Sequence, residues 1–294
     1  MTCSSAPPAG ATFRSIPISY LHARNAGSGR QSVRILTLNC LWHGNARDRL
    51  DAIGRVLDEG NVDFLCLQEV TRRRNIRLLE KRLKTYGRAE YRPYGIAVTG
   101  GLVSFSRRPI ERSSYEVFRG RGPHLTLGWA DRLLRKGFLI SWLRLDSLPM
   151  VVVNTHFLAN YDEDWTPNNR FAREQRNDLT QLAEAIARLD RSALVIVAGD
   201  LNVPATSPML EDFVSRCELH DVFACAPSAV PSTIRPSTAN SPALAIDHIL
   251  YRHPSNEPLA VTARLRFDEP LQLANSRHAF ASDHLAVEAE IVLD

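Results

Sequence analysis

The segment Val195–Val203 constrains the fold and the chemistry of this chain more than any other stretch. An apolar run ends in a glycine, and a carboxylate and an amide follow at alternate positions, Asp200 and Asn202. The apolar run is typical of a buried strand. Because side chains alternate faces along an extended chain, Asp200 and Asn202 should point the same way from its end. Taken alone, the pattern also fits a turn, but a carboxylate and an amide delivered together indicate a polar site.

Other strand-like runs also carry polar residues at or near their ends. The runs are 33–39, 62–69, 150–156 and 245–250, and a last one, 282–287, leads into a closing strand. Their polar residues are Asn39, Glu69, His156, Asp247, Asp283 and His284. Burying so many carboxylates, amides and imidazoles separately would be costly. Their repeated position at strand ends therefore predicts one shared pocket.

This set, in this order, resembles the endonuclease/exonuclease/phosphatase superfamily, which includes deoxyribonuclease, abasic-site endonucleases, inositol polyphosphate phosphatases and neutral sphingomyelinases. The matching motifs are Asn39, Gln68-Glu69, Thr155-His156, Gly199-Asp-Leu-Asn202, Asp247 and Ser282-Asp-His284. The resemblance implies an α/β fold of the deoxyribonuclease-like kind. That fold is a four-layered sandwich of two packed, mostly antiparallel sheets flanked by helices. The sequence itself shows helices alternating with strands.

The bulk composition is compatible with one such domain. At 294 residues the chain can bury a full core. Residues 1–32 are rich in Ser, Ala, Gly and Pro, which predicts a flexible N-terminal leader before a domain at 33–294. The five cysteines form no CxxC pair, which favours buried free thiols in a reducing compartment. No membrane span or secretory signal is evident, so we expect a cytoplasmic monomer, with secretion left open.

Further elements follow from periodicity. Apolar residues at helical spacing predict helices over 47–59, 72–84 and 169–190. Strands are expected over 101–106 and 137–143, and a proline-rich irregular loop over 226–242.

Positive charge is concentrated rather than large. The net charge of +4 is mild, but arginine and lysine crowd residues 72–84 and 107–136. These segments fit a solvated helix face with charged loops. They equally fit attraction to phosphate on a lipid surface or a nucleic acid, and both interpretations stay open.

The oxygen-bearing residues suit a hard divalent cation. Phosphoester hydrolysis needs a cation to offset charge, a base to activate water and donors for the transition-state oxygens. Glu69, Asp283 and the amide of Asn39 suit Mg²⁺, with Mn²⁺ as a substitute. Each could instead be a capping or loop residue. The resemblance implies that Glu69 is the principal metal ligand.

The resemblance also implies catalytic roles. Asp200 matches the aspartate that orients or deprotonates the water, and Asn202, His156 and His284 match residues that contact the phosphate. Asp247 matches the aspartate that fixes the catalytic histidine, although an Asp inside a strand is often structural. From the residues alone, a histidine paired with a carboxylate is favoured as imidazolium, a charged donor suited to a phosphoryl oxygen.

Shorter matches bear on the substrate. Gly128-Trp129, Arg135-Lys136-Gly137 and Asn154–Tyr161 resemble the neutral sphingomyelinase branch, in which a lysine just before a strand supports catalysis. Lys136 is the matching residue, and an ordinary surface lysine would also fit.

We therefore expect a Mg²⁺-dependent, sphingomyelinase-like phospholipid phosphodiesterase that releases a phosphorylated head group. It should reach lipid from solution, with peripheral contact to an anionic membrane. Two alternatives stay open: a metal-dependent DNA or RNA endonuclease or exonuclease, and a non-catalytic binding module on the same scaffold.

Overall fold

The computed structural model describes residues 31–120, 135–223, 230–236, 244–274 and 277–293. The predicted leader lies outside these residues except for its last two, which begin the first strand at Gln31. Trp129 and most of the loop predicted over 226–242 also lie outside them.

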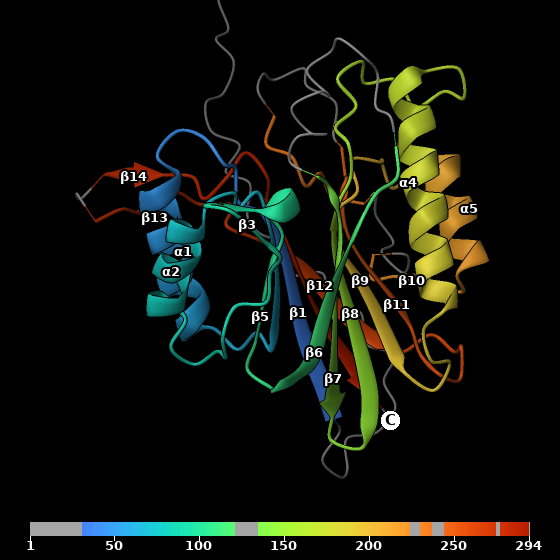
Figure 1. Ribbon diagram of the computed structural model, residues 1–294, viewed down its shortest axis with the longest axis horizontal. Helices are drawn as coiled ribbons and strands as arrows, with labels where there is room; N and C mark the ends of the chain where they lie inside the picture. The colour runs from blue at the N-terminus through green and yellow to red at the C-terminus, as the bar shows by residue number, and fades with distance from the viewer. Residues whose placement is uncertain (1–30, 121–134, 224–229, 237–243, 275–276, 294) are drawn as a thin grey trace, which may run out of the picture.

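Two sheets pack face to face through the middle of the molecule (Figure 1). The five-stranded sheet has the order β12 (Ala260–Arg266), β15 (Ala286–Leu293), β1 (Gln31–Asn39), β2 (Phe64–Gln68) and β5 (Val103–Ser106). The six-stranded sheet has the order β10 (His220–Asp221), β11 (Asp247–Arg252), β9 (Leu194–Asp200), β8 (Leu148–His156), β7 (Gly137–Leu145) and β6 (Ile110–Val117). Neighbouring strands run antiparallel except for the pairs β1–β2 and β8–β9.

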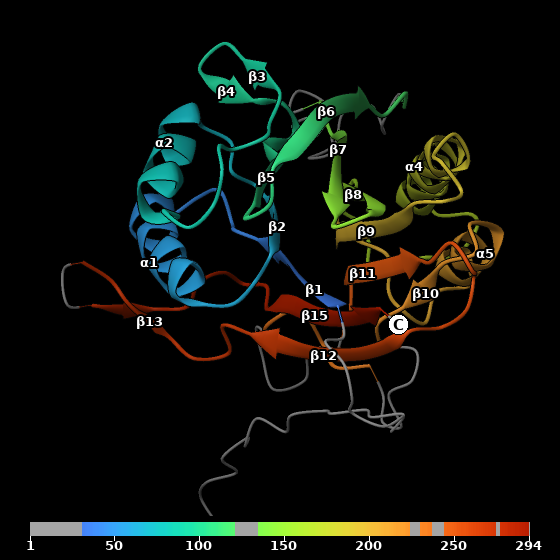
Figure 2. The same ribbon diagram turned by 90° about the horizontal axis from the view of Figure 1, so that it is seen from below.

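Helices cover the outer face of each sheet. Figure 2 shows α1 (Ala46–Glu59) and α2 (Arg73–Arg82) beside the five-stranded sheet. It shows α4 (Arg170–Ala187) and α5 (Pro208–Arg216) beside the six-stranded sheet. The predicted four-layered, deoxyribonuclease-like sandwich is therefore confirmed.

Two short hairpins project from this frame. One pairs β3 (Pro93–Tyr94) with β4 (Ala97–Val98), and the other pairs β13 (Leu271–Gln272) with β14 (His278–Ala279). A single β-bridge between Arg72 and Ala97 connects the first hairpin to the residue before α2.

The local sequence explains where the helices begin and which of their side chains are buried. Leu50, Ile53 and Leu57 lie on one side of α1 and are all buried against the sheet. The side chain of Asn169 caps α4 by accepting hydrogen bonds from the first-turn amides. Pro208 opens α5, where its missing N–H and fixed φ suit the first helical turn.

The core has three parts, one between the sheets and one under each pair of helices. Strand β1 illustrates the arrangement, because Ile35 faces the other sheet while Leu36 and Leu38 face the helices. Alternation along an extended strand buries both faces of β1. A fully buried side chain such as Ile35 contributes roughly 1.5–3 kcal/mol of transfer free energy.

Strand register brings the functional residues to one end of both sheets. Asn39 pairs with Gln68 across β1 and β2, and His156 pairs with Asp200 across β8 and β9. Asp247, at the start of β11, also pairs with Asp200. The carboxyl ends of four strands and the start of a fifth therefore meet.

Part of the predicted basic segment has a structural role. Residues 73–82 form α2, which buries Ile76 and Leu79. Arg82 pairs with Asp51 of α1 at 2.6 Å, which links the two helices. The other arginines leave both interpretations of this segment open.

Candidate functional site

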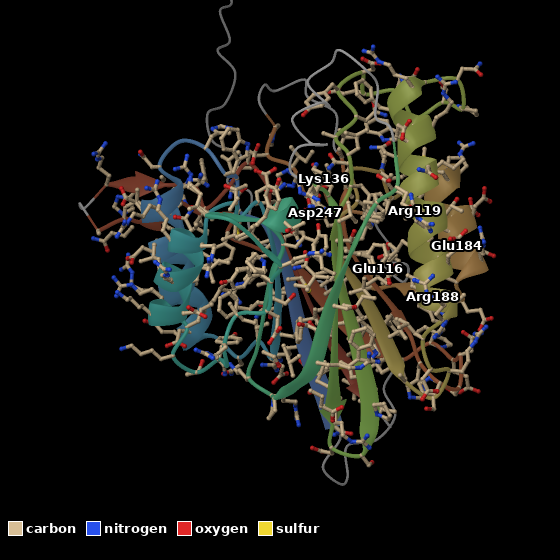
Figure 3. The ribbon with its side chains drawn as sticks, viewed as in Figure 1. Glu116, Arg119, Lys136, Glu184, Arg188 and Asp247 are labelled. Carbon is tan, nitrogen blue, oxygen red and sulfur yellow. The ribbon has the colours of Figure 1, made fainter. Side chains whose placement is uncertain are left out.

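A cavity of about 250 Å³ opens where these strands end. Eight of the nine predicted site residues line it, and the ninth, Asp247, contacts one of them directly. Figure 3 shows Lys136 and Asp247 at this end of the two sheets. The eight lining residues are Asn39, Glu69, Lys136, His156, Asp200, Asn202, Asp283 and His284. A larger cavity of about 470 Å³ beside Trp142 contains none of them.

Asp200 stands at the centre of the site and is 1 % exposed. Its Oδ2 accepts a hydrogen bond from Asn39 Nδ2 at 3.0 Å, and its Oδ1 accepts from the backbone N–H of Asn202 at 2.9 Å. Burial, together with the negative charge of Asp247, raises the pKa of Asp200 to about 6. A carboxylate held in this way is a competent proton acceptor near neutral pH.

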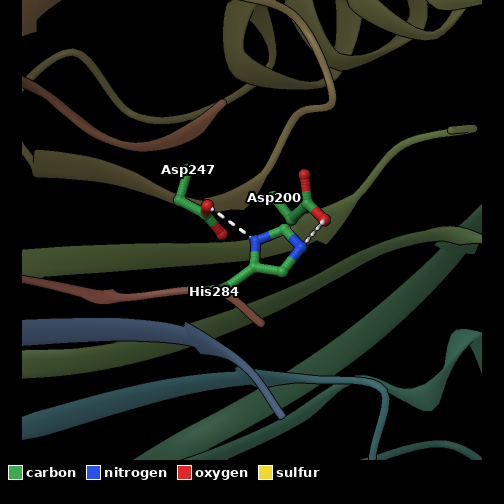
Figure 4. Close-up of side chains that lie close together, drawn as sticks. All are labelled: Asp200, Asp247 and His284. Carbon is green, nitrogen blue, oxygen red and sulfur yellow. Dashed lines mark hydrogen bonds and ion pairs between the residues drawn. The ribbon is translucent and has the colours of Figure 1, made fainter. Parts of the chain in front are cut away.

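His284 lies between two carboxylates (Figure 4). Its Nδ1 donates to Asp247 Oδ2 at 2.8 Å, and its Nε2 is 4.0 Å from Asp200 Oδ2. Burial lowers the pKa of His284, but the charges of Asp247, Asp200 and Asp283 outweigh it and raise the pKa to about 10. His284 is therefore an imidazolium at neutral pH, as the sequence predicted for a histidine paired with a carboxylate.

The same three residues, Asp200, Asp247 and His284, place ligand atoms within 4.8 Å of one another, a spacing that could hold a metal ion. The hydrogen bond to Asp247 already occupies the Nδ1 of His284. An imidazolium also repels a cation and offsets the charge of the two carboxylates. The arrangement fits proton transfer better than metal binding.

His156 and Lys136 form a second pair. Lys136, directly before β7, donates to the carbonyl of Phe157 at 2.7 Å, and its Nζ lies 3.0 Å from His156 Nε2. Burial and the positive charges of Lys136 and His284 lower the pKa of His156 well below its ordinary value. His156 is thus neutral, and the positive charge on this side of the cavity belongs to Lys136, which is 9 % exposed.

Glu69 holds its carboxylate at the edge of the cavity. Oε1 accepts from Asn39 Nδ2 at 3.1 Å, and Oε2 accepts from the backbone N–H of Trp42 at 2.9 Å. Glu69 itself has φ 60°. Gly101 has φ 66°, and an added Cβ there would lie 3.1 Å from the Glu69 Cα, so both its backbone conformation and its close packing favour glycine.

The donor set fits a hard cation. Glu69 and the exposed Asp283, which accepts from Ser282 Oγ at 3.1 Å, offer carboxylate oxygens to the same cavity. The Asn39 amide oxygen accepts from the N–H of Leu41 at 3.1 Å. The Asn39 amide nitrogen donates to both Glu69 and Asp200, so this residue links the two carboxylates.

Asn202 holds its loop rather than reaching freely into the cavity. Its φ is 50°, and its Nδ2 donates to the carbonyl of Phe157 at 3.2 Å. Its own carbonyl accepts from Gln175 Nε2 at 2.8 Å and from Trp165 Nε1 at 3.0 Å. The predicted contact between Asn202 and a phosphate stays a prediction.

Some residues that shape the site were missed by the sequence analysis. Gln175 of α4 is fully buried and also donates to the carbonyl of Leu158 at 2.8 Å, which ties two site loops together. Gln68 and Asn154 entered the sequence analysis only as parts of matching motifs. Gln68 Nε2 donates to Asn154 Oδ1 at 2.8 Å and joins the two sheets. The available signal was a polar residue at a core position of its element, such as Gln175 beside Leu179.

Comparison with known proteins places the chain among phosphoester-cleaving enzymes. Residues 36–284 match the model of the Endonuclease/Exonuclease/phosphatase family. A Drosophila melanogaster protein assigned as a neutral sphingomyelinase is 27 % identical over 283 residues, covering 89 % of this chain and 61 % of that protein. Sphingomyelin phosphodiesterase 2 of Mus musculus is 28 % identical over 178 residues, covering 58 % of this chain and 41 % of that protein. The chain thus spans less than two thirds of these relatives.

Solved structures share the fold. SmcL superposes with a TM-score of 0.70 at 17 % identity, covering 88 % of this chain and 99 % of that chain. Caenorhabditis elegans TDP2 has a TM-score of 0.66 at 19 % identity, covering 89 % and 98 %. A Staphylococcus aureus beta toxin with bound magnesium ions has a TM-score of 0.69 at 17 % identity, covering 88 % and 99 %. The family match and the relatives support the predicted enzyme class, a phosphodiesterase.

Proposed function

This chain belongs to the endonuclease/exonuclease/phosphatase family, and we propose that it is a Mg²⁺-dependent phosphodiesterase that hydrolyses a phospholipid and releases its phosphorylated head group. The observation that carries the proposal is the buried Asp247–His284–Asp200 arrangement beside the oxygen ligands of Glu69 and Asp283. A proton donor, a proton acceptor and a cation site thus share one cavity.

Asp200 is the proposed base. Its carboxylate accepts the proton of the attacking water while that oxygen adds to phosphorus. Asn39 and the backbone of Asn202 hold the carboxylate in place, so little reorganisation is needed at the moment of attack. A pKa of about 6 leaves the group ionised, and still basic, near neutral pH.

His284 is the proposed acid. Its Nε2–H passes a proton to the leaving oxygen as the bond between phosphorus and that oxygen breaks. Asp200, 4.0 Å away, then returns the proton it took from water, so the pair ends in its starting state. Asp247 keeps the imidazolium oriented throughout.

Two further groups act on charge. Glu69 and Asp283 would hold Mg²⁺, with Mn²⁺ as a substitute, and the bound ion would supply Lewis-acid stabilisation of the phosphate. The bound magnesium of the beta toxin structure supports this choice of ion. Lys136, beside neutral His156, places an ammonium among the residues that line the cavity, where it would donate to a phosphoryl oxygen.

The rim of the cavity supports a lipid substrate. Among the described residues, the large apolar side chains that stay exposed are Trp42, Tyr94, Ile96, Tyr161 and Phe280. Trp42 and Tyr161 line the cavity itself. The hairpin that carries Ile96 is joined to the cavity residue Thr71 through Val98 N–H, and Phe280 lies three residues before Asp283.

Arginines accompany these apolar groups. The Arg135 guanidinium lies 5.5 Å from the ring centre of Tyr94, and that of Arg235 lies 3.8 Å from the ring centre of Phe280. Apolar and cationic groups together suit an anionic lipid–water interface, where each basic residue adds about 1 kcal/mol. No helix in the described parts of the chain is long and apolar enough to cross a membrane.

The substrate test compares two reactions under the same conditions. Release of phosphocholine and of other head groups from mixed micelles is measured beside nicking of supercoiled DNA, with Mg²⁺ and with chelator. We expect Mg²⁺-dependent head-group release that fades in Asp200→Asn. Efficient DNA cleavage without head-group release would identify a nuclease instead. Binding of phospholipid or DNA without hydrolysis of either would favour the non-catalytic module.

A further inference from the structure

Arg49 is a buried cation that the proposed reaction does not use. It lies in the first turn of α1 and is 5 % exposed. Nη1 donates to the carbonyls of Cys40 at 3.0 Å and Ala281 at 2.7 Å. Nη2 donates to the carbonyls of Leu41 and His43, both at 2.7 Å. All four hydrogen bonds therefore go to backbone carbonyls.

These carbonyls belong to two loops that deliver the proposed metal ligands. Residues 40–43 follow Asn39 at the end of β1, and their Trp42 N–H holds Glu69 Oε2 at 2.9 Å. Ala281 lies two residues before Asp283. The Arg49 guanidinium thus connects two loops. One of them orients Glu69, and the other carries Asp283.

The local backbone shows why a clamp is needed. Leu41 has φ 52°, a left-handed conformation that a non-glycine residue rarely adopts. This conformation turns the carbonyls of Cys40, Leu41 and His43 toward one point, where only a multidentate donor can satisfy them together. The planar fork of arginine matches that need, whereas lysine offers a single nitrogen.

Arg49 carries a buried charge, and burying a charge has a desolvation cost. Its four carbonyl partners offset that cost, and they belong to loops that adjoin the proposed metal ligands. Burial lowers the pKa of Arg49, and the negative charges of Asp283 and Glu69 oppose that shift. The guanidinium therefore lies within electrostatic reach of both carboxylates proposed to bind Mg²⁺.

We propose that Arg49 is a positioning residue for the metal side of the site. By holding residues 40–43 against Ala281, it sets the separation of Glu69 and Asp283 across the cavity. The inference rests on the proposed Mg²⁺-dependent function. Residues behind metal ligands typically change metal affinity by about 10–100-fold when mutated.

The chain offers a matched control in Arg107. Its Nη2 donates to the carbonyls of Asp58, at 3.2 Å, and of Gly60. These carbonyls lie at the opposite end of α1 from Arg49. Arg107 therefore also donates to more than one backbone carbonyl, but at the other end of α1 and away from the cavity.

The experiment measures Mg²⁺ binding to the metal-free protein by calorimetry, together with thermal unfolding in chelator. We expect Arg49→Lys to weaken Mg²⁺ binding by about 10-fold or more. Arg107→Lys should lower the unfolding temperature without changing Mg²⁺ affinity. Millimolar guanidinium should partly restore Mg²⁺ affinity to Arg49→Ala, since the free ion can reoccupy the four carbonyls.

Each result decides between a positioning role and a structural one. Unchanged Mg²⁺ affinity in Arg49→Lys would overturn the proposal, and so would equal losses in Arg49→Lys and Arg107→Lys. If Arg49→Lys does not fold, Arg49→Gln is measured in its place. Failure of both to fold, while Arg107→Lys folds, assigns Arg49 to the fold and overturns the proposal. Absence of Mg²⁺ binding by the wild-type protein would instead refute the proposed function.

Discussion

Substituting Gly199 by alanine should damage catalysis through the backbone alone. Gly199 lies in β9 directly before Asp200 and pairs with Thr155 of β8. A Cβ added to Gly199 would lie 2.0 Å from the carbonyl oxygen of Thr155 and 3.0 Å from its nitrogen. Real Cβ atoms essentially never come within 3.0 Å of such an atom, so the backbone of β8 or β9 must shift here by about 1 Å to relieve the contact.

The displacement should lower both the stability of the protein and the rate of the reaction. Overpacking of this kind costs about 1–3 kcal/mol of stability. For a domain of this size, that corresponds to a fall of roughly 2–10 °C in Tm. The same movement separates Asp200 from His156, which it faces at 3.4 Å across the two strands. A misplacement of about 1 Å at a reacting group can lower the rate by about 10²-fold.

The assay is kcat at saturating Mg²⁺, measured well below the Tm of the variant. Gly60→Ala is the matched control, because its added Cβ would lie at an ordinary 3.5 Å from the carbonyl of Leu57. The control should keep wild-type kcat and Tm. A Gly199→Ala protein with near wild-type kcat would refute the claim that the spacing of β8 and β9 sets the position of Asp200.

Three further outcomes follow from the site. Glu69→Gln should weaken activation by Mg²⁺ strongly while the circular dichroism stays native, and an unchanged metal titration would contradict the role of Glu69. Asp200→Asn and His284→Ala should each lower kcat by at least about 10²-fold, which steady-state kinetics on the folded variants would reveal. Burial, with the charge of Glu174, raises the pKa of Asp178 from 3.8 to about 8, so the folded state binds the extra proton and loses stability as pH rises between these values. Asp178→Asn should therefore raise Tm more at alkaline than at acidic pH, and an equal effect at both would argue against a buried, protonated Asp178.

Many residues of the site could be predicted because the end of a buried strand has a recognisable local sequence pattern. An apolar run followed by a polar residue marks both a buried strand and its exit, as at Asp200 and His156. Eight predicted residues line one cavity for this reason. Residue types and their order were sufficient, since each signal lies within a few residues of its strand.

Charge states were harder to predict than positions. The His284 imidazolium was expected from its carboxylate partner, and the 2.8 Å contact with Asp247 bears this out. The neutral state of His156 depends on burial and on the charge of Lys136, which is 20 residues away in sequence and 3.0 Å away in space. A local sequence pattern cannot reveal a contact between residues so far apart in the chain.

The sequence also did not predict the exact ends of helices and strands, or the buried polar residues on the helices. The strand expected over 62–69 is Phe64–Gln68, and the helix expected over 169–190 ends at Ala187. Arg49 and Gln175 occupy core positions of α1 and α4, where periodicity alone predicts apolar packing. Their partners are carbonyls of distant loops, which become visible only once the chain is folded.

The two sheets divide the chemistry between them. The five-stranded sheet and its loops supply Asn39, Glu69 and Asp283, while the six-stranded sheet supplies His156 and Asp200. Hydrogen bonds cross the boundary from Asn39 to Asp200 and from His284, before β15, to Asp247 at the start of β11. Neither half contains the proposed cation site and the proposed base together. The proposed activity therefore requires the packed pair of sheets, and substitutions that shift one sheet against the other should weaken metal binding and proton transfer at once.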